Sequence, residues 1–532
     1  MVGDWAEGRY LPSSTNLNWS PCDDGQKCAV LDVPLYYDHP NGTRARVPLT
    51  KYPASTKPYL GMVLYNPSGP GESAISRLDC WASRLMPIIG SNYDLVTWEP
   101  RGIEFSTPNT NCTLQPNSTA YLIPRTERRW EKITGSAGSF TSLRNFYDFA
   151  QKQGQYCEER TGGPNNAGQY MSTGVVVKDM LTILDAYAAH PDSKNTFVMM
   201  ASDRVRRVIL DGAVDADDYY SSVYLSNPRD TDAEFSSFFV YCHLAGPEHC
   251  DFYTGTLAYN IFTRFERLLA RLDTQTSAIQ GWANASAIAT VLSAIRAEAF
   301  ISSYSPRKEW TALANILVSF EKRAQDLKTK ALAVPNDPQV ASVATSREWR
   351  AAVFCTNTAG TLYGQTLEQM SPIALAQEQQ SYVGGEVFND LRVDCAGWPI
   401  KGMGTYRGSF GGPAKNPILF ASSTRDPVTP QKNCLKAACI FEGAQCLIAD
   451  GVGHITQSLF NKCTNAKINA YFQTGQLPGK DSFCPQEAGS WGVMIPGNMT
   501  VDEYADYDAI KAKFALSNAT TASLASAATS TL

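Results

Sequence analysis

The chain has 532 residues, of which 43% are hydrophobic, and a formal net charge of −5. This length allows one large domain with an insertion, or two to three ordinary domains, around a sizeable core. The sequence has no long basic run and no stretch of about 18 apolar residues, so we expect neither a nucleic-acid partner nor a membrane span. Its five histidines are scattered and no Cys/His cluster has zinc spacing, so no metal or other cofactor is expected.

Cysteines and glycosylation sequons favour an oxidising, secretory environment. The chain contains fourteen cysteines. Its seven Asn-x-Ser/Thr sequons are at Asn18, Asn41, Asn111, Asn117, Asn284, Asn498 and Asn518. The N-terminal Met1–Trp5 carries neither a basic region nor an apolar segment, so we expect that a secretory signal has been lost. The alternative is a protein that stays inside the cell.

Short strands with loops are predicted in the first fifty residues. Val30–Leu35 alternates between apolar and polar positions before a turn, and Val47–Tyr52 reads as the next strand. Cys22 and Cys28 flank a turn and suit a short disulfide loop. The remaining disulfide pairing cannot be read from the sequence.

A glycine- and proline-rich loop follows the next predicted strand. The apolar run Gly61–Tyr65 leads into Asn66–Ser73, which contains two glycines and two prolines. Such a loop can leave backbone N–H groups facing a ligand oxygen. Its position after an early strand favours an oxyanion loop, with Ser68 and Gly69 as donors, over an ordinary tight turn.

Another buried strand is predicted at Tyr93–Trp98, and in the loop after it we expect Arg101 to brace the sheet rather than to act in catalysis. Residues 140–190 read as helical and packed on a sheet. The apolar positions at helical spacing are Val175, Val176, Met180, Ile183, Leu184 and Tyr187. Asp179 and Asp185 are expected to face elsewhere.

The character of the chain changes after the strand predicted at 205–210. From 216 to 385 Ala, Leu, Glu and Arg dominate, which predicts a helical insertion. Its helices are predicted at Phe262–Leu272, Ala287–Phe300 and Trp310–Leu327. The predicted division is 1–215 for the N-terminal part of the core, 216–385 for the helical cap, 386–490 for the C-terminal part of the core and 491–532 for a partly disordered tail.

An acid and a histidine late in the chain have the order that an α/β-hydrolase requires. The apolar run that begins at Ile418 ends in a polar turn with Asp426, and about one strand and one helix later His454 lies in a glycine-rich turn. In this fold the acid follows one late strand and the histidine follows the next, so the two meet at the carboxyl edge of the sheet. We therefore predict that Asp426 and His454 form a catalytic pair.

Five segments together resemble the tripeptidyl/prolyl aminopeptidase-like α/β-hydrolases of the peptidase S33 type, which have a TAP-like C-terminal region. The likeness covers about residues 15–490, with the motifs in family order, and fungal secreted members are the most similar. The segments are Asn66–Gly71, Asp94–Gly102, Arg204–Gly212, Asp426–Pro430 and Gly453–His454. The resemblance implies an α/β fold with a mostly parallel central sheet and a helical cap.

The same resemblance implies a Ser–Asp–His triad, in which Asp426 matches the acid and His454 the base. It also implies hydrolysis of short peptides from a free N-terminus, or of small esters and amides, by a secreted monomer. The serine should lie on a G-x-S-x-G elbow between the helix at 175–190 and the strand at 205–210, but no G-x-S-x-G occurs in the chain. Activity is therefore expected to be impaired, with the nucleophile unknown.

The gap is too short for the missing part. An elbow needs a strand, a tight turn and the start of a helix, roughly 12–20 residues, and Lys194 is only two positions from Thr196. We predict that Thr196–Met200 takes the place of the lost strand. The loop also departs from the family pattern at Ser68 and Glu72, where the family prefers glycine. The carboxylate of Glu72 would disfavour a nearby oxyanion because both are negatively charged.

Three explanations for the missing elbow remain open. A skipped exon or a mispredicted intron would remove a compact block and leave both flanks intact. A true pseudoenzyme would keep a binding pocket under the cap. A surviving hydrolase would need a substitute nucleophile, for which Ser202 is nearest although it lacks the glycines of an elbow.

Overall fold

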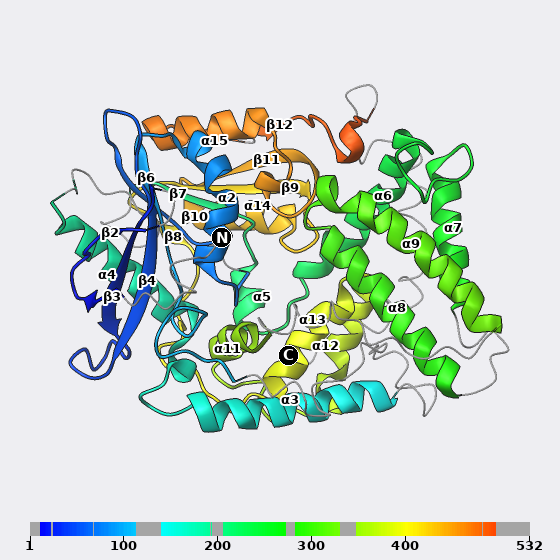
Figure 1. Ribbon diagram of the computed structural model, residues 1–532, viewed down its shortest axis with the longest axis horizontal. Coiled ribbons are helices and arrows are strands. Elements are labelled where there is room, and N and C mark those ends of the chain that lie inside the picture. The colour runs from blue at the N-terminus through cyan, green and yellow to red at the C-terminus, as the bar shows by residue number, and fades with distance from the viewer. Residues whose placement is uncertain are drawn as a thin grey trace.

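The computed structural model describes residues 11–22, 25–67, 69–112, 140–191, 193, 206–272, 282–329, 347–480 and 482–495. Strands and the helices packed on them lie on one side of the molecule, and the helices between residues 231 and 396 lie on the other side and below (Figure 1). This is the α/β arrangement with a helical cap that the sequence predicts. The predicted limits of the four parts stay a prediction.

Within the described residues the strands form two separate main sheets, and the N-terminal half has the strand order β1-β3-β4-β6-β5, with β2 paired to β3. The strands are β1 (Ser13–Ser14), β2 (Ser20–Pro21), β3 (Lys27–Pro34), β4 (Arg44–Tyr52), β5 (Gly61–Tyr65) and β6 (Tyr93–Trp98). β5 and β6 run parallel, whereas β4 is antiparallel to both of its neighbours. The predicted bounds of β5 and β6 are confirmed, and β3 and β4 begin three residues earlier than predicted.

The C-terminal half has the order β12-β11-β9-β7, and all of its strands are parallel. The strands are β7 (Val208–Asp211), β9 (Ile418–Arg425), β11 (Gln445–Val452) and β12 (Phe483–Cys484). A small pair, β8 (Gly412–Pro413) and β10 (Phe441–Glu442), lies apart. Because parallel strands share a direction, the loops after β7, β9 and β11 emerge at one edge of the sheet.

The edge strands of the two halves, β5 and β7, lie close to each other. At their start, Arg207 Nη1 donates to the hydroxyl of Tyr93, the residue paired with Gly61, at 3.1 Å. At their end, Tyr65 is within electrostatic range of Asp211, which together with burial raises the pKa of the Tyr65 phenol to about 12. Within the described ranges no strand pairs with the open edge of either β5 or β7. The prediction that 196–200 fills this position falls outside the described residues.

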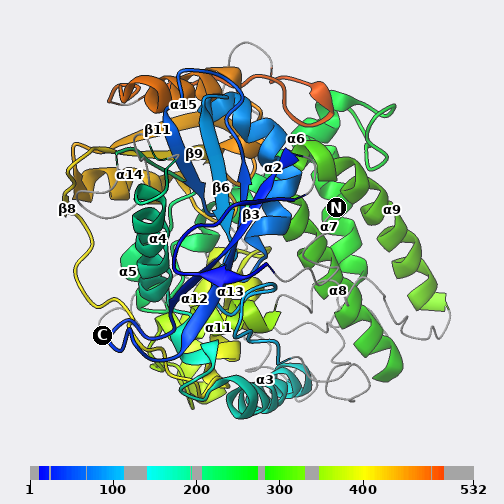
Figure 2. The same cartoon turned by 60° about the vertical axis from the view of Figure 1, so that its left-hand side comes forward.

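Helices cover both faces of the sheet. Figure 2 shows α2 (Ala74–Ile89) and α4 (Thr173–Ala188) on either side of the strands. Leu78 and Leu85 of α2 pack against β6, while Ile183 and Leu184 of α4 pack in the cluster that contains β3 and β4. Burying these leucine and isoleucine side chains stabilises each face by about 1.5–3 kcal/mol per side chain. The prediction of a helix packed on the sheet at 175–187 is thus confirmed.

Most of the other helices belong to the cap. Those of the cap region are α5 (Ala216–Tyr220), α6 (Thr231–Ala245), α7 (Ala258–Arg271), α8 (Trp282–Ser302), α9 (Pro306–Thr329), α11 (Arg347–Asn357), α12 (Leu367–Gln380) and α13 (Gly385–Ala396). Those outside it are α3 (Phe140–Thr161), α14 (Gln431–Ile440) and α15 (Lys462–Thr474). α8 and α9 include two of the three predicted cap helices, and α7 covers the third, Phe262–Leu272, except for its last residue. The described part of the chain also contains the short 3-10 helices η3 (Ala167–Tyr170), η4 (Asn227–Asp230), η5 (Thr456–Ser458) and η6 (Ser490–Gly492).

Arg101 braces the sheet as expected, but the prediction that Asp179 faces elsewhere is wrong. The Arg101 side chain is buried, donates to the carbonyls of Leu35 at 2.7 Å and Pro34 at 3.1 Å, and forms an ion pair with Asp179 of α4. Tyr37 adds a hydroxyl donor to the Asp179 carboxylate at 2.8 Å. Asp179 can be fully buried on the helix face that meets the sheet because this guanidinium neutralises its charge.

Six disulfides are formed within the described residues, including the predicted Cys22–Cys28 loop. The others are Cys112–Cys157, Cys242–Cys250, Cys355–Cys395, Cys434–Cys446 and Cys463–Cys484. Cys80 and Cys439 are free and exposed. In the ranges that the structure covers, no helix has both the length and the apolar character needed to cross a bilayer.

Candidate active site

Asp426 lies in the turn that follows β9 and is fully buried. Its carboxylate accepts hydrogen bonds from the backbone N–H groups of Val428 at 2.9 Å, Thr429 at 2.7 Å and Ile455 at 2.8 Å, and from the Thr429 hydroxyl at 2.9 Å. Burial pushes its pKa upward, but the charge of His454, the bond to that ring and the backbone donors outweigh burial and hold the pKa below its usual value. Asp426 is therefore ionised and fixed in orientation.

His454 lies in the turn after β11, with its ring against Asp426. Nδ1 is 2.9 Å from Oδ1 and 3.1 Å from Oδ2 of Asp426, so the carboxylate holds the ring in the tautomer with the proton on Nδ1. Burial lowers the pKa of His454, but the Asp426 charge and hydrogen bond raise it more, and the net pKa is above the usual value. Nε2 has no hydrogen-bond partner among the described residues, and 22% of the side chain is exposed. This is the geometry that a general base needs.

Backbone contacts fix the turn that carries His454. The N–H of Gly453 donates to the carbonyl of Arg425 at 3.0 Å, and the hydroxyl of Ser423 donates to the carbonyl of Gly453 at 2.7 Å. The N–H of His454 donates to the carbonyl of Tyr304, at the end of α8, at 3.2 Å. The ring of Tyr304 lies edge-on to the imidazole, with centroids 5.0 Å apart. The cap thus touches the candidate base directly.

Asp211, at the end of β7, is a site residue to which the sequence assigned no role. Its carboxylate accepts from the N–H of Thr456 at 2.9 Å and from the Thr456 hydroxyl at 2.8 Å, two residues beyond His454. Gly212 follows with φ +83°, and a Cβ there would lie 2.7 Å from Cγ2 of Ile455. The turn after β7 therefore packs on the histidine turn. The sequence signal that could have identified Asp211 as a site residue is its position at the carboxyl end of a predicted strand.

The loop expected to hold the oxyanion is described apart from Ser68. Gly69 is exposed, while the predicted donor Ser68 lies outside the described residues. Glu72 forms an ion pair with Arg77 of α2 at 2.5 Å, with both side chains more than 40% exposed. This arginine offsets the negative charge that was expected to disfavour an oxyanion. The donor role of Ser68 and Gly69 stays a prediction.

Glu99 holds the end of the same loop in place. It is fully buried at the end of β6, and accepts from the Ser73 hydroxyl at 2.7 Å and from the Ala74 N–H at 3.0 Å. Burial raises the pKa of Glu99 to about 8, although these hydrogen bonds act in the other direction. Ser73 is the N-cap of α2, so Glu99 fixes the point at which the loop becomes a helix.

The base of the cap is attached to the turn that carries Asp426. The Thr231 hydroxyl donates to the carbonyl of Pro427 at 2.6 Å, and the Asn227 amide donates to the carbonyl of Val428 at 3.0 Å. Beside them, Glu234 of α6 is fully buried, and this burial raises its pKa well above the usual value. The cap therefore begins next to the candidate acid, and a neutral Glu234 adds no charge there.

A cavity of about 620 Å³ lies away from the Asp426–His454 pair. It is lined by Trp19, His190 and neighbours at the end of α4. Tyr187 of α4 bonds to the hydroxyl of Tyr59, which precedes β5, so this end of α4 lies at the amino edge of the parallel strands. The candidate acid and base follow strands at the carboxyl edge. The cavity is therefore not where a substrate of that pair would bind.

Replacing the acid should change the titration of the base. We expect Asp426→Asn to lower the pKa of His454, because the carboxylate that favours the imidazolium is removed. NMR titration of the imidazole C–H signals measures this without any need for turnover. The exposed His39 serves as an internal control. An unchanged His454 titration would mean that the two side chains are not coupled in solution.

The chain is similar in sequence to known hydrolases. Residues 381–484 match the family model described as TAP-like protein. The chain is 26% identical over 482 residues to carboxylesterase B of Mycobacterium tuberculosis, covering 86% of each chain. It is 22% identical over 487 residues to the tripeptidyl aminopeptidase of Streptomyces lividans, covering 87% of this chain and 84% of the relative. A solved serine hydrolase from Cycloclasticus zankles is 12% identical, with a TM-score of 0.29 over 84% of this chain and 98% of its own.

Proposed function

We propose that the chain is an α/β-hydrolase with a TAP-like C-terminal region, and that Asp426 and His454 are the acid and base of a site for acyl hydrolysis. The substrates are short peptides trimmed from a free N-terminus, or small esters and amides. The observation that carries the proposal is the bond between His454 Nδ1 and the buried Asp426 carboxylate, with Nε2 left without a partner among the described residues.

These two residues have defined roles in the reaction of a complete triad. A serine attacks the acyl carbon while His454 takes the hydroxyl proton and then gives it to the leaving amine or alcohol. Asp426 keeps the ring in the required tautomer and stabilises the imidazolium. The loop at Ser68 and Gly69 faces the carbonyl oxygen as its charge develops. Without an elbow serine, His454 can still activate water, but most of the rate of a triad is lost.

Several observations support the substrate class and the location. One relative is named a carboxylesterase and another a tripeptidyl aminopeptidase, which are ester and peptide hydrolases. Six disulfides within the described residues agree with folding in the secretory pathway. Asn18, Asn41 and Asn111 are exposed, so glycosylation at these sequons is sterically possible. Secretion, glycosylation, a fungal source and a monomeric state remain predictions.

A second candidate is a pseudoenzyme that binds such ligands without turning them over. The absence of G-x-S-x-G from the sequence favours it. A binding protein of this type would keep the acid, the base and the cap.

Hydrolysis of chromogenic substrates separates the two candidates. We expect slow release from p-nitrophenyl butyrate or from a tripeptide p-nitroanilide, and we expect His454→Ala to lower it to the background rate, because no other described group bonds to Asp426 as a base. His39→Ala, at an exposed position, is the matched control. Binding of the same substrates without release would favour the pseudoenzyme, and release that is insensitive to His454→Ala would overturn the role of His454 as the base.

A further inference from the structure

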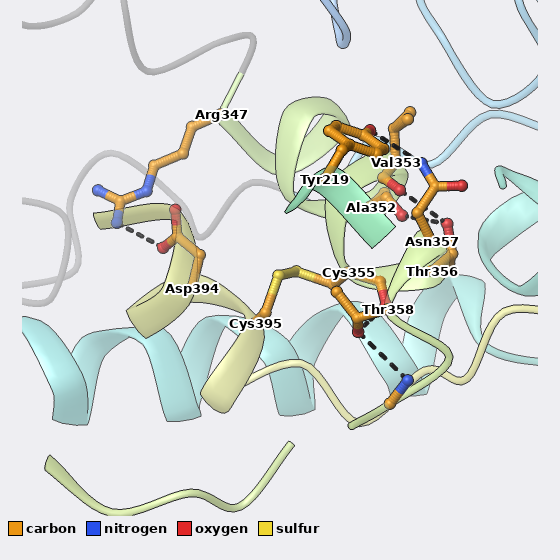
Figure 3. The surroundings of a disulfide bond; sticks show 11 residues. Tyr219, Arg347, Ala352, Val353, Cys355, Thr356, Asn357, Thr358, Asp394 and Cys395 are labelled. Carbon is orange, nitrogen blue, oxygen red and sulfur yellow. Dashed lines mark hydrogen bonds and ion pairs between the residues drawn. A yellow bond between two sulfur atoms is a disulfide. The ribbon is translucent and has the colours of Figure 1, made fainter. Parts of the chain in front are cut away.

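α11 is fixed in the cap by strong contacts near both of its ends. Near its start, Arg347 Nη2 bonds to Asp394 of α13 at 2.6 Å (Figure 3). Near its end, the disulfide between Cys355 and Cys395 joins the same two helices, and Figure 3 shows both links side by side. The position of the residues between these two links is therefore set by α13.

The last residue of α11 also reaches the core. Asn357 Oδ1 accepts the N–H of Thr173, at the start of α4, at 2.9 Å. Its amide nitrogen donates to the hydroxyl of Tyr219 at 3.0 Å, a contact that Figure 3 also shows. α11 is thus held against the core as well as against α13. Its side chains present fixed groups to the neighbouring loop.

That neighbouring loop is the glycine- and proline-rich one after β5. Gly71 has φ +90°, and a Cβ placed on it would lie 2.4 Å from the backbone nitrogen and 2.5 Å from the Cα of Arg350. The loop therefore packs directly on α11 at Arg350, in a contact that only glycine permits. The backbone of Arg350 in α11 therefore lies next to the candidate oxyanion loop.

Arg350 also belongs to the charged surroundings of the acid and base. The hydroxyl of Tyr304 is within electrostatic range of Arg350, Asp426, Glu72 and Arg77. The ring of Tyr304 lies edge-on to His454. Arg350 therefore acts electrostatically on the same phenol as Asp426, and its backbone lies against the candidate oxyanion loop at Gly71.

Among these groups, Arg350 alone has no anionic partner. Glu72 pairs with Arg77, and Asp426 pairs with His454. Within the described ranges Arg350 makes no ion pair or side-chain hydrogen bond, and its Nε–H is buried without an acceptor. A buried donor of this kind normally has a partner in a native protein. An anion supplied by a ligand would satisfy it.

We propose that Arg350 is a specificity-determining residue that binds a carboxylate of the substrate while the acyl group faces His454. A planar guanidinium with several donors matches a carboxylate in a bidentate geometry. The proposal rests on the proposed function and names its substrate class: peptides or esters with a carboxylate close to the bond that is cleaved. That carboxylate comes from a free C-terminus or from an acidic side chain.

Equilibrium binding tests this on the full chain without requiring turnover. The ligands are Ala-Ala-Ala as the free acid and as the C-terminal amide, and Ala-Glu-Ala-amide against Ala-Gln-Ala-amide, measured by calorimetry. We expect at least one acid to bind about tenfold more tightly than its neutral match. The first pair reports a C-terminal carboxylate and the second an acidic side chain. If neither acid is preferred, the proposal is overturned.

Variants show whether Arg350 is the cause. Arg350→Gln should abolish the preference for the acid, and Arg350→Lys should keep part of it because the charge remains. Arg267→Gln, at an exposed position on α7, should leave the preference unchanged. Thermal unfolding of each variant checks that the fold is retained, and Arg350→Lys gives the test a second variant if Arg350→Gln fails to fold. A full preference in Arg350→Gln would assign carboxylate binding to another group.

The outcomes also separate this proposal from the proposed function. An acid preference that depends on Arg350, without any release of product, keeps the carboxylate site and rejects hydrolysis. Release from p-nitrophenyl butyrate that depends on His454, without any acid preference, keeps hydrolysis and rejects the role of Arg350. Each result decides one of the two proposals independently of the other.

Discussion

Inserting a strand–turn–helix segment with G-x-S-x-G between Lys194 and Thr196 is expected to raise ester hydrolysis by about 10³-fold or more. The magnitude follows from the loss that complete triads show when the nucleophile is removed. The base needs no rearrangement for this gain, since His454 is already held by Asp426 with Nδ1 at 2.9 Å from the carboxylate. The segment can be taken from the matching position of a curated relative.

The contact between the segment before β7 and the start of β6 indicates what the inserted strand must displace. Adjacent strands in a sheet lie about 4.8 Å apart, so a strand between two others needs about twice this separation between them. At present Arg207 bonds to Tyr93 at 3.1 Å, which joins the two halves of the sheet through long side chains. We expect this bond to be broken or rearranged in the inserted variant.

Labelling with a fluorophosphonate probe measures the result directly. The inserted variant should react with the probe, while the chain without the insertion should not, because the probe requires an activated serine. Changing the inserted serine to alanine is the matched control, and His454→Ala in the inserted variant should also abolish labelling. Labelling of the chain as given would instead point to a substitute nucleophile, for which Ser202 is the first position to change.

The transcript provides an independent check of the origin of the gap. Sequencing cDNA across codons 190–200 shows whether a longer form exists. A longer form that encodes G-x-S-x-G would support a skipped exon or a mispredicted intron. A transcript without it would leave a pseudoenzyme or a substitute nucleophile.

Local patterns were sufficient for the strands and helices whose burial follows from their own sequence. β5 is a continuous apolar run and β6 is largely apolar, and the structure has both at the predicted bounds. Asp426 and His454 were found because each follows a strand in a fixed order, and the structure brings them within hydrogen-bond distance. Sequence order alone is informative here because parallel strands bring the ends of distant segments to one edge.

Residues whose role depends on a distant partner could not be found in this way. Asp179 looked like a solvated helix acid, yet it is buried because Arg101 arrives from a loop 78 residues earlier. Glu99 stays buried by bonding to Ser73 and Ala74 of another segment. Arg350 gives no local signal, because its position depends on a glycine far earlier in the chain.

The buried pair of Arg101 and Asp179 is expected to give the largest effect on stability. Arg101→Met should lower the free energy of unfolding by about 3–5 kcal/mol, because it leaves the Asp179 carboxylate buried without its cation. Asp179→Leu should cost a similar amount for the converse reason. Arg101→Met also removes the hydrogen bonds from the guanidinium to the carbonyls of Pro34 and Leu35 at the end of β3.

The double variant distinguishes the ion pair from ordinary packing. Arg101→Met with Asp179→Leu removes both charges, so it should cost clearly less than the sum of the two single changes, with an interaction free energy of roughly 2 kcal/mol or more. Some loss should remain, because the carbonyls of Leu35 and Pro34 lose their donor. Urea unfolding followed by tryptophan fluorescence measures all four proteins under the same conditions.

Lys178, which precedes Asp179 in α4, supplies the control for the loss of a charged pair. Lys178 forms an exposed pair with Asp38 at 3.6 Å, with side chains 43% and 61% exposed. Lys178→Met should therefore change stability by less than about 1 kcal/mol. If Arg101→Met costs no more than Lys178→Met, or if the single changes simply add, the charge of Arg101 does not hold β3 to α4. Packing alone would then position the edge of the sheet that supports the candidate oxyanion loop.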